Sequence, residues 1–413
     1  MLNSLQYDYD IVIIGGGLVG ASLAAALGPS DLKVLVVEAI ELNSEIQPSY
    51  DERTVALTHS AKLIYTGIGI WNSIASQQSE PIKDIHISNA GHFGKTHLSH
   101  KHVGTDALGY VVPTRVLGQV LWEKMRQSNN IDIMTPANAV STTPIKGGHA
   151  IDIQLASAQE THRVKTKLLV VADGGRSAIT AQLDIPRDAS PYENAAVLSI
   201  MSSDKDHGNR AYERFTSEGP LALLPNGKKT YAMVWTTHID DLERKMGLSD
   251  DAFIKELQAV FGDKAGNFSR PSARNYYPLS HGVVNNPISN HAVIVGNAAH
   301  TVHPVAGQGF NLGLRDVAAL AETIHDHRQS QTLGSSDMLN QYSQNRQRDT
   351  RMVSWFTHGL IALFSNDFFI PALGRNLGLK SIELFPLAKR FLLKKTMGLA
   401  GKQSKLAMGI PLD

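Results

Sequence analysis

The stretch that decides the fold is Ile11–Gly28, which reads IVIIGGGLVGASLAAALG. It begins inside a short apolar run, Tyr9 to Ile14, whose β-branched residues are typical of a parallel strand buried on both faces. Residues 18–27 are expected to form a helix that ends at Gly28-Pro29. Between strand and helix, three glycines follow the G-x-G-x-x-G spacing: Gly15, Gly17 and Gly20.

This strand, turn and helix have the pattern of a dinucleotide-binding site. Gly15 allows a tight turn, Gly17 lets the backbone approach a pyrophosphate, and Gly20 lets helix and strand pack closely. The helix N-terminus would offer free N–H groups to the phosphates. A second strand, Lys33 to Val37, ends in Glu38, whose carboxylate would accept hydrogen bonds from the ribose hydroxyls. The pattern alone fits an NAD dehydrogenase or a flavoprotein.

The same apolar run could suggest a signal peptide or a membrane span. A signal peptide begins with basic residues, but the first Lys or Arg of this chain is Lys33, and Asp8 and Asp10 precede the run. Three consecutive glycines would also interrupt a spanning helix. We therefore expect a buried strand, a glycine turn and a buried helix.

Two later segments end in turns suited to a flavin. Lys167 to Ala172 reads as a buried strand and is followed by Asp173-Gly174-Gly175-Arg176-Ser177. His291 to Val295 reads as another strand, and it opens into GNAAHTVHPVAGQGFNLG at residues 296–313. A helix is expected to start near Phe310. Its N-terminus would suit the pyrimidine end of a flavin, which gains negative charge on reduction.

The three segments in this order resemble the motifs of the group A flavoprotein aromatic hydroxylases, which share the para-hydroxybenzoate hydroxylase-like fold. The resemblance is closer still to the branch of that family in ubiquinone biosynthesis. It covers nearly the whole chain and is carried by DERTVAL at residues 51–57, by residues 213–225 and 296–316, and by GRNLGLKSIELF at residues 374–385.

The resemblance implies an α/β fold with a Rossmann-like FAD-binding domain, an inserted and mostly antiparallel β-sheet substrate domain, and a C-terminal helical region. A long helix is expected from about Ser336 to Phe364. The predicted FAD-binding domain comprises residues 1–75, 105–185 and 276–330, the substrate domain residues 76–104 and 186–275, and the C-terminal region residues 331–413.

The family motifs also imply which residues surround the flavin. Pro304 would shape the backbone at the flavin ring, and His303 is a candidate for proton transfer, with an orienting or structural role as the alternative. His300 is a second histidine in the same motif. The chain departs from the family pattern at Asn297, where Asp is usual, and at Thr180, where Arg is frequent. The predicted cofactor-binding residues are Gly15, Gly17, Gly20, Glu38, Arg53, Arg115, Asp173, Gly174, Gly296, Asn297, Pro304, Gly307, Gln308, Gly309 and Asn311.

The activity that the resemblance implies is an FAD-dependent aromatic monooxygenase. FAD would be reduced by NADH or NADPH and would react with O2 to a C4a-hydroperoxyflavin, which would hydroxylate the ring of a 2-polyprenyl-6-methoxyphenol. A hydroxylase of another ring position or another aromatic, a non-catalytic flavin-binding scaffold of a biosynthetic complex, and a simple NAD dehydrogenase are the alternatives.

The amino-acid composition argues against several kinds of partner and metal site. The 39 Lys and Arg nearly balance the 38 Asp and Glu, so we expect no nucleic-acid partner. The chain has no Cys, which excludes disulfides and thiolate-bound metals and fits a cytoplasmic protein. The histidines between His92 and His102 have no carboxylate among them, so no metal site is expected.

A basic amphipathic segment lies near the C-terminus. From Lys380 to Lys405 there are seven Lys or Arg against one acid, Glu383, with Leu and Phe residues between them. Such a segment can lie on the inner face of a membrane or dock on a partner, here another ubiquinone-biosynthesis protein. The alternative is an ordinary helix that packs its apolar side on the body of the protein.

Overall fold

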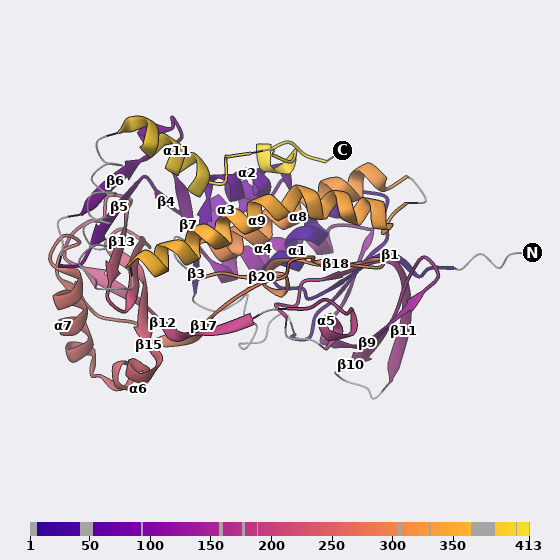
Figure 1. The fold of residues 1–413 in the computed structure, drawn as a ribbon, viewed down its shortest axis with the longest axis horizontal. Helices are drawn as coiled ribbons and strands as arrows, with labels where there is room; N and C mark the ends of the chain where they lie inside the picture. Colours follow the sequence, from indigo (N-terminus) through magenta and orange to yellow (C-terminus); the bar gives the residue numbers. More distant parts are fainter. Residues whose placement is uncertain are drawn as a thin grey trace, which may run out of the picture.

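The structure of the chain is a computed structural model. It covers residues 6–41, 53–91, 94–156, 160–175, 178–187, 189–303, 307–329, 332–364, 385–401 and 403–412. These residues form two large β-sheets and a small one. In Figure 1 the sheet that contains β1 lies on the right, the sheet that contains β12 lies on the left, and the long helix α9 extends from one toward the other, with α8 packed beside it.

The first sheet has a parallel centre. Its central strands pair in the order β18-β19-β11-β1-β2-β8, and the pairs β19/β11, β11/β1, β1/β2 and β2/β8 are parallel. An antiparallel extension of β9 and β10 continues from β11. The strands are β1 (Tyr9–Ile14), β2 (Val34–Val37), β8 (Ile131–Met134), β9 (Ala137–Ile145), β10 (Gly148–Leu155), β11 (Thr161–Val171), β18 (Ile288–Ser289) and β19 (Ala292–Ile294).

Both faces of this sheet are covered, which explains why β1 reads as a continuous apolar run. Ile11 and Ile13 pack into the core formed with the helices, whereas Val12 and Ile14 face a second core against β9, β10 and α5. The helices associated with this sheet are α1 (Leu18–Leu27), α2 (His59–Gly67), α3 (Trp71–Gln77), α4 (Thr114–Arg126), α5 (Ile179–Gln182), α8 (Gln308–His327) and α9 (Ser336–Phe364).

The second large sheet is mostly antiparallel. Its order is β20-β17-β12-β15-β14-β13-β5-β6, with β16 beside β12, and the pair β13/β5 is parallel. Two helices, α6 (Ile239–Gly247) and α7 (Asp250–Phe261), accompany it. The strands are β5 (Asp84–Asn89), β6 (Lys95–Ser99), β12 (Ala189–Ser203), β13 (Arg210–Thr216), β14 (Gly219–Pro225), β15 (Thr230–His238), β16 (Phe268–Ser269), β17 (Asn275–Val283) and β20 (His300–Thr301).

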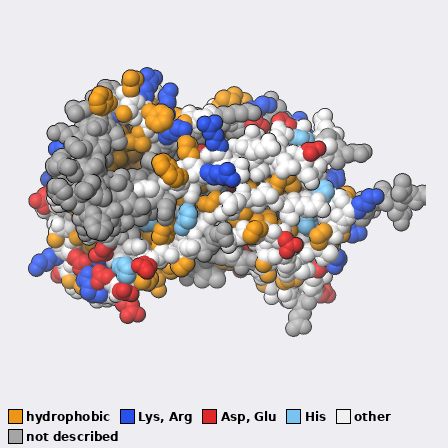
Figure 2. All heavy atoms as spheres, viewed as in Figure 1, with side chains coloured by type: hydrophobic (Ala, Val, Ile, Leu, Met, Phe, Trp, Pro, Cys, Tyr) orange, Lys and Arg blue, Asp and Glu red, His pale blue; other side chains and the backbone are white. Residues whose placement is uncertain are grey.

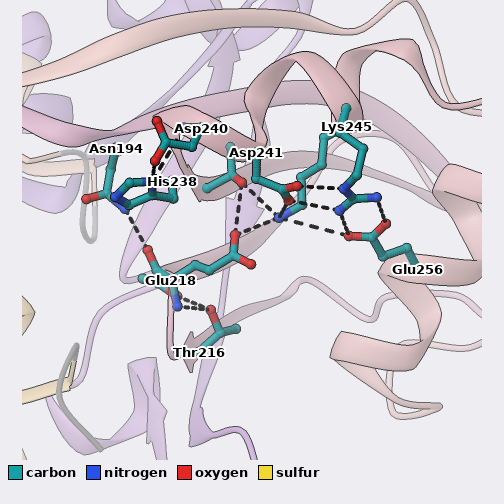
Figure 3. Close-up of polar contacts among 11 residues, drawn as sticks. Asn194, Thr216, Glu218, His238, Asp240, Asp241, Lys245 and Glu256 are labelled. Carbon is teal, nitrogen blue, oxygen red and sulfur yellow. Dashed lines mark hydrogen bonds and ion pairs between the residues drawn. The ribbon is translucent and has the colours of Figure 1, made fainter.

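A buried lysine fastens α6 and α7 to this sheet. Lys245 is 1% exposed, and its Nζ donates hydrogen bonds to Glu218 Oε2 at 2.6 Å and to Thr237 Oγ1 at 2.8 Å. Figure 3 shows these contacts together with Asp241 and Glu256 from the two helices. Each charge in this cluster has an opposite charge beside it, so we assign the cluster a structural role in holding the two helices on the sheet.

The small sheet joins the two large ones. It consists of β3 (Thr54–Thr58), β7 (Gly109–Pro113) and β4 (Glu80–Ile82) in that order. After α9, the described chain resumes with α11 (Pro386–Thr396), which packs on the second sheet through Leu393 and Met397. Two short 3-10 turns are η1 (His100–His102) and η4 (Leu406–Met408).

The architecture has the predicted class, and several predicted bounds are confirmed. The strand at Tyr9–Ile14 and the helices at residues 18–27 and 336–364 lie where the sequence placed them. The helix expected near Phe310 begins at Gln308. The predicted domain boundary between residues 275 and 276 falls inside β17, and the division into domains stays a prediction. In the described part of the chain, none of the helices has the length and apolarity needed to cross a membrane.

Candidate functional site

The three predicted motifs meet at one edge of the parallel sheet. Gly15 follows β1, Asp173 follows β11 and Gly296 follows β19, and these strands are parallel neighbours. A Cβ on Gly15 would lie 2.8 Å from Asp173 Cα, and a Cβ on Gly296 would lie 3.1 Å from the side chain of Val19 in α1. Ligands of open α/β sheets bind at this edge, beyond the carboxyl ends of the strands.

The glycines of the first turn have different roles. Gly15 has a φ of +100°, which favours glycine, and a Cβ on Gly20 would lie 1.9 Å from the carbonyl oxygen of Gly15. A Cβ on Gly17 would meet nothing within 4 Å. Gly15 and Gly20 are therefore required by the fold itself, whereas Gly17 faces open space where a ligand backbone could approach.

The start of α1 fits a bound anion. Gly17 is its N-cap and provides no side-chain cap, and the first turn carries no acidic residue. The first N–H groups of a helix have no partner within the helix, and its dipole is positive at that end. A pyrophosphate placed there would satisfy both.

Glu38 lies at the end of β2, beside the same turn. It is 7% exposed, and its Oε2 accepts a hydrogen bond of 2.6 Å from the backbone N–H of Gly16, while Oε1 accepts one of 3.0 Å from Ile40. The carboxylate thus holds the glycine turn against the sheet. Its oxygens keep further lone pairs for a ribose hydroxyl, and the ribose contact stays a prediction.

The start of α8 forms the third part of the site. Gly307 is its N-cap, with a left-handed φ of +62°, and a Cβ there would lie 3.1 Å from Ala56 in β3. The Gln308 side chain donates to the carbonyl of Thr396 at 3.2 Å. Like α1, α8 has no side-chain cap and no acid in its first turn, so its N–H groups suit the pyrimidine end of a flavin.

Asn311 fixes the position of this helix start. Its Nδ2 donates to the carbonyls of Ala56 at 2.7 Å and Gly307 at 2.6 Å, and its Oδ1 accepts from the N–H and hydroxyl of Thr58 at 2.8 and 3.1 Å. The amide is therefore fully hydrogen-bonded within the protein. It shapes the cradle by tying α8 to β3, and a direct flavin contact stays a prediction.

A buried ion network lies beneath the third turn. Asp316 Oδ2 contacts His300 Nε2 at 2.5 Å and accepts from the N–H of Gly296 at 3.3 Å, and Oδ1 accepts from Arg346 Nε at 2.8 Å. Burial would raise the pKa of Asp316, but His300 and Arg346 outweigh it and hold that pKa at about 2. His300 is thus a partner of a structural carboxylate.

His303 faces the second sheet. It is 2% exposed, and its ring lies 5.5 Å from that of Tyr192 in β12, in an edge-to-face arrangement. Burial lowers the pKa of His303 to about 4, so the imidazole is neutral at pH 7. Its Nδ1 has no hydrogen-bond partner among the described residues. A neutral imidazole with an open nitrogen can hydrogen-bond a phenol, and its proton-transfer role stays a prediction.

The two predicted arginines lie close to each other. Thr54 of β3 pairs with Pro113 of β7, and Thr114 donates from its N–H and hydroxyl to the carbonyl of Arg53, at 2.8 and 3.1 Å. Arg115 donates from Nη2 to the Gln78 side chain at 3.0 Å. The two residues therefore flank the small sheet, and their flavin contacts stay predictions.

Arg187 links the second and third motifs and was not predicted from the sequence. Its Nη2 donates to the carbonyl of Asn297 at 3.2 Å and to Thr301 Oγ1 at 2.9 Å. A Cβ on Gly175, whose φ is +78°, would lie 2.0 Å from Arg187 Nη1, so a larger residue there would displace this guanidinium. Tyr192 was missed in the same way, because both residues come from the second sheet and its entry loop.

Three more of the predicted site residues lie in the second and third turns. Asp173 Oδ1 accepts from the N–H of Gly175 at 2.8 Å, and Gly174 has a φ of +74° with open space around it. Gly309 lies one residue inside α8. Pro304, Arg176, Ser177 and His92 lie outside the described residues. No group of His, Asp or Glu in the described ranges is arranged to hold a metal ion.

Comparison with known proteins assigns the chain to a family. A family described as FAD binding domain matches residues 8–356. The chain is 30% identical to the ubiquinone hydroxylase UbiL of Rhodospirillum rubrum, over 98% of this chain and 93% of that protein. It is 27% identical to the 3-demethoxyubiquinol 3-hydroxylase of Escherichia coli, over 94% of this chain and 98% of that protein.

Solved structures share the fold. The p-nitrophenol 4-monooxygenase PnpA from Pseudomonas putida superposes with a TM-score of 0.79 at 17% identity, covering 97% of this chain and all of that one. PqsL from P. aeruginosa, in complex with 2-aminobenzoylacetate, gives a TM-score of 0.76 at 20% identity, covering 90% of this chain and 99% of that one.

Proposed function

Because the chain belongs to the FAD-binding-domain family that includes ubiquinone hydroxylases, we propose that it is a 2-polyprenyl-6-methoxyphenol hydroxylase, which uses FAD, NADH or NADPH, and O2. The observation that carries the proposal is the meeting of three turns at the carboxyl ends of β1, β11 and β19, with two uncapped helix starts beside them. A scaffold that binds flavin without using it would not need the second helix start, aimed at the reducible ring.

The protein's own residues have separate tasks in this proposal. The N-terminus of α1 binds the pyrophosphate, Glu38 binds the adenosine ribose, and Asp173 binds near the middle of the cofactor. Arg53 and Arg115 add donors for phosphate or ribityl oxygens. FAD, when bound, supplies the electron transfer and the activation of oxygen.

The start of α8 would hold the flavin ring. The positive end of its helix dipole and the backbone N–H groups of its first turn would stabilise the negative charge that the pyrimidine end gains on reduction. Gly296, Asn297, Pro304 and Asn311 complete this side of the proposed site, with Gly174 opposite. Gly307 positions the helix start.

The substrate would lie between α8 and the second sheet. There His303, neutral at pH 7, would accept a hydrogen bond from the phenol hydroxyl and so increase the electron density of the ring at the position para to it. Tyr192 supports the His303 ring from β12. A polyprenyl tail favours lipid, so the proposal includes a position on a membrane surface, with docking on other ubiquinone-biosynthesis proteins as the alternative.

A second ring position is the competing assignment. The relative from Escherichia coli is named a 3-demethoxyubiquinol 3-hydroxylase, so the same family framework is found with a different ring substrate. The two assignments differ in substrate, since one ring is a methoxyphenol and the other a quinol.

The test is aerobic oxidation of NADH and of NADPH by the FAD-loaded protein. Reactions contain a short-chain 2-prenyl-6-methoxyphenol, a short-chain 3-demethoxyubiquinol, or neither. The molecular mass of the organic product is measured by mass spectrometry. Oxidation stimulated by the phenol, with a gain of one oxygen, is expected. Oxygen gain on the quinol alone would move the assignment to the second ring position, and hydrogen peroxide as the sole product would reject both substrates.

A further inference from the structure

The exposed face of α11 is unusual for a surface helix. Leu387, Arg390, Phe391 and Lys394 follow one another at spacings of three, one and three residues, which places them on one face. Leu387 is 82% exposed and Phe391 is 65% exposed, and Phe385 just before the helix is 62% exposed. Single exposed apolar residues need no explanation, but three within seven residues form a patch.

The orientation of this face is fixed by the opposite one. Leu393 is fully buried and Met397 is 2% exposed, and both pack with Leu98 and Leu108. Lys389 is also buried on this side. Since the helix is anchored along its inner side, the outer apolar side chains cannot turn inward without breaking that packing.

Basic side chains lie between the apolar ones. Arg390 and Lys394 are exposed, and Lys395 Nζ lies 5.6 Å from the centre of the Phe391 ring. No acidic residue occurs from Phe385 to Gly401. Figure 2 shows hydrophobic and basic side chains side by side over α11, at the upper left of the view.

A neighbouring helix adds a large aromatic side chain. Lys395 Nζ lies 3.1 Å from the sulfur of Met352 in α9, and Trp355, one turn further along α9, is 77% exposed. Tryptophan is enriched where apolar chains meet water at a membrane surface. The patch consists of Phe385, Leu387 and Phe391, with Arg390, Lys394 and Lys395 as its cations, and Trp355 is an exposed aromatic side chain on the helix that contacts Lys395.

We propose that this patch docks on the surface of an anionic lipid bilayer. Protein interfaces are depleted of charge, and of lysine in particular, at their apolar centre. Here cations and apolar rings alternate on one helix face, as in helices that lie in the headgroup region. Apolar side chains would enter the acyl boundary while the cations pair with anionic headgroups.

The docked helix would also touch the flavin cradle. The carbonyl of Thr396, the last residue of α11, accepts from Gln308, and the carbonyl of Met397 accepts from the N–H of Ser60 at 3.2 Å. Docking itself is independent of the substrate, but its purpose rests on the proposed function. With α11 docked on the bilayer, a polyprenyl substrate in that bilayer would lie near the start of α8, where the flavin is proposed to bind.

Vesicle sedimentation of the full-length, FAD-loaded protein tests the proposal. Vesicles of pure phosphatidylcholine are compared with vesicles that contain 30% phosphatidylglycerol. We expect binding to the anionic vesicles that weakens with salt. The Arg390→Gln/Lys394→Gln variant should bind about 30-fold more weakly, at roughly one kcal/mol for each cation near an anionic surface. The Leu387→Ser/Phe391→Ser variant should lose binding to the anionic vesicles.

The controls separate docking from folding and from catalysis. The matched charge control is Arg126→Gln/Lys255→Gln, two exposed cations on other helices, which should bind like the wild type. All variants should keep the wild-type melting temperature and the wild-type kcat on a short-chain phenol in detergent. Absence of wild-type binding, or equal binding by the patch variants, would overturn the proposal, and so would a patch that captures only another protein. A failed hydroxylase assay with intact vesicle binding would reject the proposed function alone.

Discussion

Replacing Asp316 with Asn tests how the third motif is held. The carboxylate is buried between His300 and Arg346 and also accepts from the N–H of Gly296, so Asp316→Asn keeps the shape but removes the charge. The pKa of Asp316 is about 2 in the folded protein, against a reference of 3.8. That difference corresponds to about 2 kcal/mol of stabilisation of the charged form.

The expected loss of stability is larger than this pKa difference. Removing one partner of a buried ion pair typically costs about 3–5 kcal/mol, because the other charge remains buried. With an unfolding entropy of about 2 cal/mol/K for each residue, a loss of roughly 3 kcal/mol lowers the melting temperature by about 4 °C. Since Gly296 follows β19 at the proposed flavin site, the variant should also bind FAD more weakly.

Thermal melting and FAD titration, both followed by flavin fluorescence, give the two readings. Asp349→Asn is the matched control. Asp349 pairs with Arg346 at 2.6 Å and Arg315 at 3.1 Å, but its carboxylate is 21% exposed and, among the described residues, is not hydrogen-bonded to the turn at Gly296. It should cost less stability and leave FAD affinity unchanged. A melting temperature of Asp316→Asn within 1 °C of wild type, with unaltered FAD affinity, would refute the reasoning.

Unfolding at acidic pH tests independently whether the negative charge of Asp316 stabilises the folded protein. Because the folded pKa of Asp316 lies below its unfolded value, its contribution is complete above about pH 4 and is lost as pH falls toward 2. The stability difference between wild type and Asp316→Asn should therefore shrink over that interval in urea unfolding. A difference that stays constant from pH 5 to pH 2.5 would show that the charge is not what stabilises the turn.

Three further predictions use single substitutions elsewhere. Gly20→Ala should prevent folding, because its Cβ would lie 1.9 Å from a backbone oxygen, whereas Gly17→Ala should fold normally and bind FAD about 10-fold more weakly, as measured by solubility and flavin titration. Lys245→Met should lower stability by only about 1–2 kcal/mol in urea unfolding without changing FAD affinity, because the Glu218 carboxylate that it leaves is 40% exposed and regains water. In the wild type, the lowered pKa of His303 should reduce the free energy of unfolding by about 3 kcal/mol as the pH falls from 6.5 to 4. His303→Gln lacks this titrating group and should therefore lose less stability over that interval in the same assay.

Local pattern was sufficient for the elements that begin and end on strong signals. The first strand and helix were predicted with their observed bounds, because a continuous apolar run, a glycine turn and a Gly-Pro stop each have one structural meaning. β11 was predicted too short. Its first residues, from Thr161, pair with β10 in the antiparallel extension. The first three are exposed, and residues 164–167 alternate between buried and half-buried, so this part lacks the continuous apolar run of a strand covered on both faces.

The motifs were predictable, but the contacts that hold them were not. Asn311 was predicted as a flavin ligand from its motif, yet its amide is used to tie α8 to β3, more than 250 residues away in the chain. Arg187 and Tyr192 belong to no motif, and only the pairing of the second sheet brings them to the site. Long-range pairing of this kind leaves no periodic signal in the sequence.

The C-terminal segment shows the same limit. Its composition predicted a basic amphipathic helix, but four leucines and phenylalanines within one helix do not say which of them face the protein. Packing on Leu98 and Leu108 selects Leu393 for burial and leaves Leu387 and Phe391 outside. A tertiary contact thus decides which side of an amphipathic helix is available.

One helix connects all of these contacts. Along α8, Gln308 bonds to the end of α11, Asn311 to β3 and Asp316 to the third turn, and a Cβ on Gly313 would lie 3.2 Å from Gly296. These residues point in different directions, so a shift of one residue in the register of α8 would rotate every contact by about 100°. No single partner could then be recovered without losing the others. The long motif that opens α8 is therefore constrained by three neighbouring structures as well as by the flavin.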